Sequence, residues 1–198
     1  MHPESFDTII QSYLDNNVGL SKNFIPVKLI SALKKHVLLL NDVQKFHRAG
    51  TGNKNAVSLQ QNIRTDKIFW LDRAHENENE DAFLLLMDRF IAFLNMTCYT
   101  GITDSEFHFS IYEPGSFYTS HFDRFQNDSR RAFSMVHYLN ELWQPGDGGE
   151  LCVHHAGANQ KIPPLAGTSV FFKSDELQHE VLLTNVRRLS ITGWLKTN

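Results

Sequence analysis

Apolar residues recur at helical spacing in three stretches of the first hundred residues. These stretches are residues 5–16, a run from about Pro26 to Leu40, and residues 81–94. In each of them the apolar side chains fall three or four positions apart, which places them on one face of a helix. The third stretch follows an acidic segment, residues 76–80, whose charges complement the positive end of a helix dipole. We therefore expect three amphipathic helices that cover a sheet.

From residue 106 onward the period of the pattern changes from 3.6 to 2. Phe107, Phe109 and Ile111 alternate with polar residues, and Pro- and Gly-containing turns separate the short segments that follow. Strands are predicted over residues 63–71, 106–111, 117–122, 132–140, 151–155, 168–172 and 188–195. Helices followed by short strands with Pro/Gly turns predict an α+β chain that is mainly β. The core is expected to be a jelly-roll, or double-stranded β-helix, with the N-terminal helices packed on its major sheet.

Residues 47–62 form a polar, Gly-containing segment between the second helix and the first long strand. Loops of this length without secondary structure of their own are usually flexible or functional. We expect this segment to be a flap that engages a substrate.

Composition narrows the class of protein. The 198 residues suggest a single domain, with a helical part over about 1–100 and the jelly-roll core over about 101–198. A net charge of −3 gives no strong field for a nucleic acid or an acidic membrane. Neither a secretory signal nor an apolar run long enough to span a bilayer is visible. Cys98 and Cys152 lie far apart and are expected to be buried, reduced thiols, so we expect a cytoplasmic protein without a membrane partner.

The first candidate chemistry is His121-Phe122-Asp123. In an extended segment His121 and Asp123 project from the same face, and an imidazole with a carboxylate offers two ligands to a divalent metal. His179 is the best candidate for a third ligand. Two histidines and one carboxylate form the facial triad of non-haem Fe(II) oxygenases, which leaves coordination positions open. No His-Glu-x-x-His motif accompanies these residues, so iron is favoured while Mn(II) and Zn(II) stay open.

The last predicted strand carries the second candidate group. Alternation puts Arg188, Ser190, Thr192 and Trp194 on one face. A guanidinium with hydroxyl groups beside it offers the donors that hold a small carboxylate. The alternative is that Arg188 lies at the surface of an edge strand or pairs with an acidic neighbour.

Several separated motifs together resemble a known family. The run Tyr112-x-Pro114-Gly115-x-Phe117-Tyr118-x-x-His121-x-Asp123 is similar to the metal-binding segment of the prolyl 4-hydroxylase-like 2-oxoglutarate/Fe(II) oxygenases, especially bacterial relatives of the hypoxia-factor prolyl hydroxylases. The supporting motifs are Tyr138-Leu139-Asn140-x-x-Trp143, Asp147-Gly148-Gly149-Glu150-Leu151, His179-Glu180-Val181 and Arg188-x-x-Ile191-Thr192-x-Trp194. In consistent order and spacing they cover about residues 63–195.

The resemblance implies a role for each matching position. Fe(II) would be bound by His121, Asp123 and His179. The co-substrate 2-oxoglutarate would be held by Arg188 with Tyr138, Thr192 and Tyr112, and the resemblance favours Arg188 over its neighbour Arg187 for this role. The substrate pocket would include Tyr118, Trp194 and Arg124. O2 would be the oxidant, and L-ascorbate would keep the iron reduced.

The activity implied by the resemblance is that of a 2-oxoglutarate-dependent dioxygenase. It would hydroxylate a prolyl residue of a protein substrate, with release of succinate and CO2. Other interpretations are a hydroxylase of another side chain or of a small molecule, a zinc-dependent hydrolase on a similar barrel, and a non-catalytic sensing module.

Overall fold

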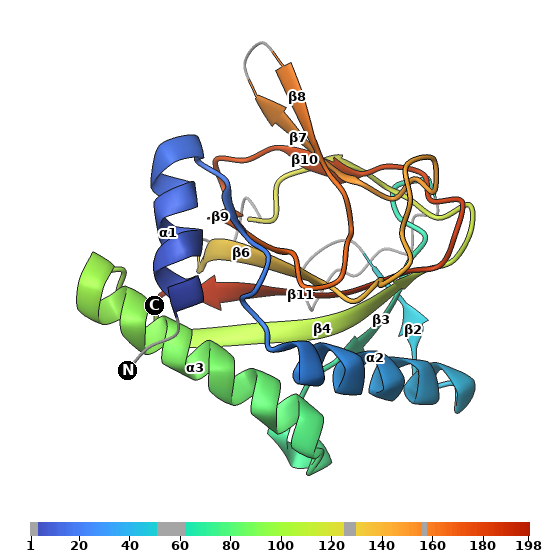
Figure 1. Ribbon diagram of the computed structural model, residues 1–198, viewed down its shortest axis with the longest axis horizontal. Coiled ribbons are helices and arrows are strands. Elements are labelled where there is room, and N and C mark those ends of the chain that lie inside the picture. The colour runs from blue at the N-terminus through green and yellow to red at the C-terminus, as the bar shows by residue number, and fades with distance from the viewer. Residues whose placement is uncertain (1–3, 51–61, 125–129, 156–157) are drawn as a thin grey trace.

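Two antiparallel β-sheets, with three α-helices against the larger sheet, make up the protein (Figure 1). The computed structural model describes residues 4–50, 62–124, 130–155 and 158–198. In chain order the elements are α1 (Glu4–Asn16), β1 (Gly19–Ser21), α2 (Val27–Asp42), β2 (His47–Arg48), β3 (Lys67–Trp70), the 3₁₀ turn η1 (Arg73–His75), α3 (Glu78–Cys98), β4 (Asp104–Tyr112), β5 (Tyr118–His121), β6 (Arg131–Tyr138), β7 (Leu151–His155), β8 (Ala158–Ile162), β9 (Ser169–Lys173), β10 (His179–Val181) and β11 (Arg188–Lys196).

The larger sheet has the strand order β1-β9-β6-β11-β4-β3-β2, and its long central strand β11 pairs with β4 and β6 along nearly its whole length. The helices lie against one face of this sheet (Figure 1). Their apolar stripes meet the sheet in an aromatic core, where the Phe90 ring lies 5.0 Å from Phe6 and 5.7 Å from Phe171. Burying a phenylalanine side chain stabilises a fold by about 1.5–3 kcal/mol, so this core holds the helices on the sheet.

The smaller sheet has the order β5-β10-β7-β8 and faces the other side of the larger one. A second apolar cluster, including Tyr138, Val153 and Phe172, joins the two sheets. The two sheets therefore form a sandwich, and the cavity described below opens between them.

The structure confirms the three predicted helices, but it extends the third. Asn77 caps α3 by accepting hydrogen bonds from the backbone N–H groups of Asn79 and Glu80, at 3.0 and 3.2 Å. The helix therefore begins three residues before the predicted stretch. The prediction for Cys98 was wrong: it is exposed at the end of α3, whereas Cys152 is buried as expected.

The predicted loop over residues 47–62 is corrected at its start. His47 and Arg48 form β2, because their backbones pair with Ile68 and Lys67 of β3. Residues 51–61 lie outside the described residues. The strand predicted over 63–71 is shorter in the structure, where only Lys67–Trp70 is assigned as a strand.

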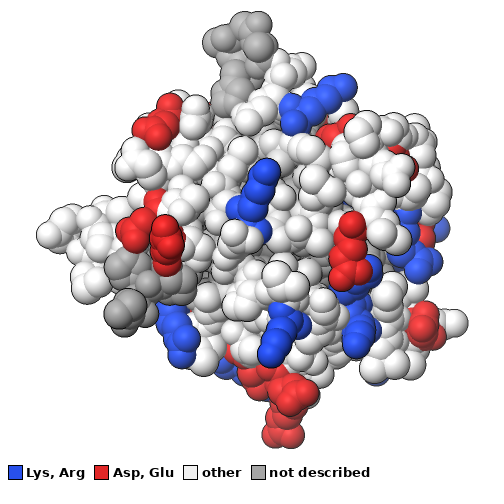
Figure 2. All heavy atoms as spheres, viewed as in Figure 1, with Lys and Arg blue, Asp and Glu red and all other residues white. Residues whose placement is uncertain are grey.

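Charged side chains of both signs are interspersed on the face shown in Figure 2, in keeping with the small net charge. Within the described residues, no helix has the length and apolar character needed to cross a membrane.

Glu80 joins three elements on the helical side of the fold. It is 1% exposed, and its carboxylate contacts His36 Nε2 of α2 at 2.8 Å, His75 Nδ1 of η1 at 2.9 Å and the Asp72 backbone N–H at 3.1 Å.

Glu80→Ala is expected to lower the free energy of unfolding by about 2–4 kcal/mol, because it leaves buried donors without their acceptor. Urea denaturation measures the change. Glu78→Gln, at an exposed position of the same helix, is the control, and its free energy of unfolding should stay within about 0.5 kcal/mol of wild type. Equal effects of the Glu80 and Glu78 variants would contradict the role of Glu80 in joining the three elements.

The buried side chains of His137 and His108 are expected to make the stability of the fold sensitive to acid. His137 is fully buried among aromatic rings, with Nδ1 2.7 Å from Ser169 Oγ, and burial lowers its pKa to about 3. Burial, helped by the charge of Arg64, lowers the pKa of His108 to about 4. Because both folded pKa values lie below the ordinary value, the unfolded chain binds protons more readily. The stabilisation is complete above about pH 6.5 and is lost as the pH falls toward 3.

Between pH 7.5 and pH 5 we expect the free energy of unfolding to fall by about 2 kcal/mol for each of these histidines, since one pKa unit corresponds to about 1.4 kcal/mol. Chemical denaturation at the two pH values measures the slope. The double variant His137→Phe/Ser169→Ala should reduce it, because it removes the titrating ring together with its hydrogen-bond partner. His47→Gln, at an exposed position, should not change it. An unchanged slope in the double variant would refute the prediction for His137.

Candidate functional site

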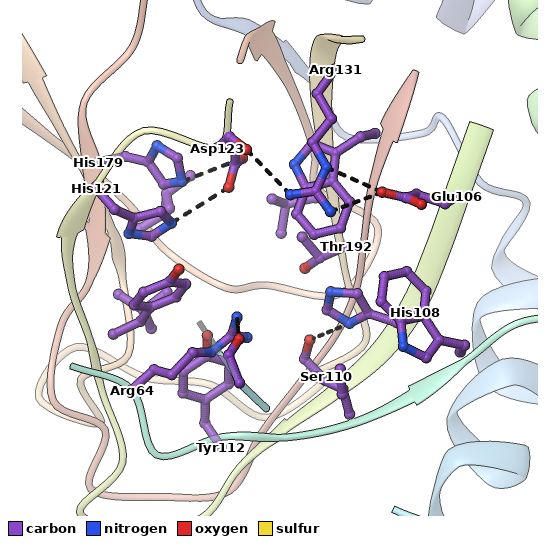
Figure 3. Close-up of a pocket in the computed structure, with 18 of the residues that line it drawn as sticks. Arg64, Glu106, His108, Ser110, Tyr112, His121, Asp123, Arg131, His179 and Thr192 are labelled. Atoms are coloured by element: carbon purple, nitrogen blue, oxygen red, sulfur yellow. Dashed lines mark hydrogen bonds and ion pairs between the residues drawn. The ribbon is translucent and has the colours of Figure 1, made fainter. Parts of the chain in front are cut away.

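Two segments that are far apart in the sequence bring three residues together at the inner face of the smaller sheet. His121 ends β5, Asp123 follows two residues later, and His179 begins β10. His179 is the direct register partner of His121 in the antiparallel β5–β10 pair, so the two rings lie 4.4 Å apart. Candidate ligand atoms of the three residues all lie within 4.8 Å of one another (Figure 3). The strand pairing therefore supplies the third member of the group, which spacing along the chain could only suggest.

Hydrogen bonds orient both imidazoles toward Asp123. His121 Nδ1 lies 2.7 Å from the Thr119 carbonyl oxygen, and His179 Nδ1 lies 3.0 Å from the Leu177 carbonyl oxygen. Because a carbonyl oxygen only accepts, each Nδ1 is the donor of its hydrogen bond, which turns each Nε2 toward Asp123. The Nε2 atoms face the two carboxylate oxygens of Asp123, at 3.5 Å from His121 and 3.6 Å from His179. Two imidazoles and one carboxylate, oriented in this way, fit a divalent cation such as Fe(II).

His179 and Asp123 are held in the protonation states that a metal needs, by different causes. Burial lowers the pKa of His179 to about 4, so this ring is neutral at neutral pH. Burial alone would raise the pKa of Asp123, but the neighbouring His179 and His121 hold it well below its ordinary value. The Tyr118 ring stacks on His121 with the ring centroids 3.6 Å apart, and the edge of Phe172 packs against His179. The aromatic neighbours restrict the rotation of both histidines.

Arg188 is a buried guanidinium at the start of β11. It is 2% exposed and donates to the Gly149 carbonyl oxygen at 2.8 Å and to Ser190 Oγ at 3.1 Å. Within the described part of the chain no carboxylate lies within ion-pair distance of it. A buried cation without a counterion is unfavourable. The surroundings of Arg188 therefore fit an anionic ligand. The alternative that Arg188 lies at the surface or pairs with an acidic neighbour is wrong.

Aromatic and small residues shape the space around Arg188. The guanidinium carbon lies 4.8 Å from the Tyr112 ring centroid and 5.1 Å from that of Tyr138. The buried Tyr138 hydroxyl has no hydrogen-bond partner in the described structure, and it offers a donor to a ligand. At Gly149, which has a φ of +74°, a Cβ atom would come within 3.0 Å of the Arg188 side chain. The Gly149 backbone can approach Arg188 closely only because it lacks this atom.

The triad and Arg188 line one cavity of about 410 Å³, together with Tyr112, Tyr118, Thr192 and Trp194. A cavity of this size takes a small ligand. At its rim Arg131 makes two contacts with Glu106 Oε1, at 2.8 and 3.1 Å, and its guanidinium lies 3.4 Å from the Trp194 ring centroid (Figure 3). Arg131 also donates to the Asp123 carbonyl oxygen at 3.2 Å, so the rim is fixed to the triad segment.

The structure brings together most of the residues singled out in the sequence. Arg124 is the exception: it does not line the cavity, and its guanidinium pairs with the half-exposed carboxylate of Asp175. Tyr138 lies deeper than the cavity lining, against Arg188.

Sequence reasoning missed the pair formed by Arg64 and Asp66. Their two contacts measure 2.8 and 2.6 Å, Asp66 is 1% exposed, and the Arg64 guanidinium lies 4.3 Å from the Tyr118 ring centroid. Arg64-Thr65-Asp66 gave the only available signal, since alternate residues of an extended segment share a face.

Comparisons of the sequence and of the structure with known proteins point to the same family. The model of the 2OG-Fe(II) oxygenase superfamily matches residues 107–196. A prolyl-4-hydroxylase from Pseudomonas putida is 34% identical and superposes with a TM-score of 0.88, covering 99% of this chain and 100% of that one. A Trichoplax adhaerens prolyl hydroxylase, solved with a hypoxia-inducible-factor peptide, is 24% identical and superposes with a TM-score of 0.85. The match covers 96% of this chain and 88% of that one.

A PKHD-type hydroxylase from Picosynechococcus is 35% identical over 92 residues, which is 45% of this chain and 41% of that relative. The match therefore spans well under half of the relative's length. The solved Pseudomonas structure, in contrast, matches this chain from end to end. The chain belongs to the 2OG-Fe(II) oxygenase superfamily, where it is one of the prolyl 4-hydroxylase-like members.

Proposed function

We propose that this protein hydroxylates a prolyl residue of a protein substrate, with Fe(II), 2-oxoglutarate and O2, and with L-ascorbate maintaining the reduced metal. In this proposal one domain with a double-stranded β-helix core carries the whole site. The observation that carries the proposal is the pairing, in one cavity, of the oriented triad with a buried Arg188 that has no carboxylate partner among the described residues.

His121, Asp123 and His179 would hold the iron. When bound, iron and 2-oxoglutarate together supply the activation of O2 that inserts an oxygen atom into a C–H bond, with release of succinate and CO2. The protein's part is to orient and to exclude water. The Nδ1 hydrogen bonds of the two histidines keep each Nε2 aimed inward, where it can bind the ion.

Arg188 would bind the distal carboxylate of 2-oxoglutarate. Its remaining guanidinium N–H groups supply charge-assisted hydrogen bonds, and the unpartnered Tyr138 hydroxyl adds a neutral donor. Thr192 and Tyr112, which line the same cavity, would complete the pocket. A dicarboxylate held at Arg188 is fixed in position, so its other end can be directed to the metal.

The open side of the cavity supports a polypeptide substrate. Trp70, Trp194 and Tyr118 line the cavity with aromatic rings, and basic residues line it as well. We propose that Tyr118 and Trp194 contact the substrate. For the proposal that the 47–62 segment engages the substrate, the support is that His47, Arg48 and Gly50, at its start, line the cavity.

The test is a coupled assay with a proline-specific arm. The protein is incubated with Fe(II), ascorbate, O2 and 2-oxoglutarate, and succinate is measured with a library of proline-containing peptides and with a matched library that has alanine in place of proline. We expect the proline library alone to stimulate succinate formation and to gain the mass of one oxygen atom. His121→Ala should give neither. Stimulation by both libraries would point to another side chain, and equal succinate from His121→Ala would remove the oxygenase proposal.

A further inference from the structure

A second group of metal-ligand side chains lies on the outer face of the smaller sheet. Cys152 and His154 are two residues apart on β7, and Glu180 is the register partner of Cys152 on β10. His179 and its partner Val153 project from the opposite face toward the triad cavity, because strand side chains alternate. Candidate ligand atoms of Cys152, His154 and Glu180 all lie within 4.8 Å of one another. One sheet thus separates this cluster from the triad.

His154 Nε2 faces the carboxylate of Glu180. His154 Nδ1 lies 3.1 Å from Oδ1 of Asn159, its register partner on β8. An amide oxygen only accepts, so Nδ1 donates this hydrogen bond. The Nε2 atom is buried, has no hydrogen-bond partner within the described structure, and lies 3.2 Å from Glu180 Oε1. A cation bound between the ring nitrogen and the carboxylate would be held by both.

The spacing matches the edge of a tetrahedral metal site. Two nitrogen or oxygen ligands at about 2.0–2.1 Å from a zinc ion, separated by the tetrahedral angle, lie about 3.3 Å apart. The separation of His154 Nε2 and Glu180 Oε1 is 3.2 Å. Cys152 is 2% exposed and adds a sulfur ligand. Half-exposed side chains of His154 and Glu180 leave one side open to water.

The donor set differs from that of the triad in a way that selects the metal. Imidazole and carboxylate without thiolate suit iron, whereas a cysteine thiolate favours zinc. Burial raises the pKa of the Cys152 thiol, and the nearby Lys161 opposes this effect. A metal would displace the thiol proton, as in other cysteine sites.

We propose that Cys152, His154 and Glu180 form a second divalent-metal site, selective for Zn²⁺, whose fourth position is taken by water. The bound ion would link β7 to β10, the strand that carries His179. This inference does not depend on the proposed hydroxylase activity.

Cobalt tests the site, because a thiolate ligand gives Co²⁺ a sulfur-to-metal charge-transfer band that the triad, which contains no sulfur, cannot produce. Reduced wild-type protein titrated with Co²⁺ should develop this band to one equivalent, and Zn²⁺ should abolish it. The band should persist in His121→Ala/Asp123→Ala, in which the triad is removed. Absence of the band in wild type would overturn the proposal.

Variants separate the site from general thiol binding. Cys152→Ser should lose the band, while Cys98→Ser, which changes the exposed cysteine, should keep it. In the His121→Ala/Asp123→Ala background, where the triad cannot bind the ion, Glu180→Gln and His154→Gln keep the thiol and are expected to weaken Zn²⁺ binding at least about tenfold, which keeps the test valid if Cys152→Ser fails to fold. If these two variants bind Zn²⁺ as tightly as that background, His154 and Glu180 form only an ion pair and the site is excluded.

Discussion

Replacing Asp123 with alanine is expected to abolish succinate formation and to weaken metal binding at the triad by more than about 100-fold. Loss of a residue that only orients a metal ligand already costs about 10–100-fold, and Asp123 is proposed as a ligand itself. Its two oxygens face His121 Nε2 and His179 Nε2 at 3.5 and 3.6 Å. Without the carboxylate, only the two imidazoles remain and the negative charge that neutralises the cation is lost.

Mn²⁺ is the suitable probe for this variant, because it prefers oxygen and nitrogen ligands and has little affinity for thiolate. Equilibrium binding of Mn²⁺ and succinate formation are measured on the same preparations. Asp175→Ala is the matched control, since that half-exposed carboxylate pairs with Arg124 outside the cavity. Circular dichroism checks that both variants fold. Wild-type Mn²⁺ affinity in folded Asp123→Ala would mean that the triad is not the metal site.

The sequence predicted a helix or a strand correctly where the local spacing of apolar residues is enough to define it. The apolar stripes predicted α1, α2 and α3, and alternation predicted the long strands β4 and β11. The shortest strands were missed, because β1, with three residues, is too short to show a period. β10, equally short, lies outside the predicted strands although it carries His179.

The site depends on register, and register is a property of the folded sheet. Asp123 could be linked to His121 by spacing alone. The placement of His179 opposite His121 follows from the β5–β10 pairing, which no local pattern specifies. Arg188 was identified as a candidate from its strand face, but its burial became evident only when Gly149 was seen to pack against it. For the Arg64–Asp66 pair, spacing gave no means of recognising that Asp66 is buried.

Arg188→Met is expected to raise the KM for 2-oxoglutarate by about 100-fold or more while leaving Mn²⁺ binding unchanged. Methionine keeps much of the side-chain volume but removes the positive charge. Each hydrogen bond to a charged group contributes about 1.5–3 kcal/mol, so losing two of them amounts to about 3 kcal/mol or more, which corresponds to at least about 100-fold in affinity. Succinate formation measured over a range of 2-oxoglutarate concentrations gives the KM.

Arg187→Met provides a control at the neighbouring position of the same strand end. Arg187 is exposed, pairs with Glu113 at 2.9 Å and does not line the cavity, so its substitution should leave the KM within about twofold of wild type. Arg188→Lys keeps the charge without the planar fork and should recover only part of the affinity. Because Arg188 is buried without a carboxylate partner in the described structure, its removal should not destabilise the free protein through a lost ion pair. A KM that rises equally in the Arg187 and Arg188 variants, or in neither, would exclude Arg188 as the co-substrate anchor.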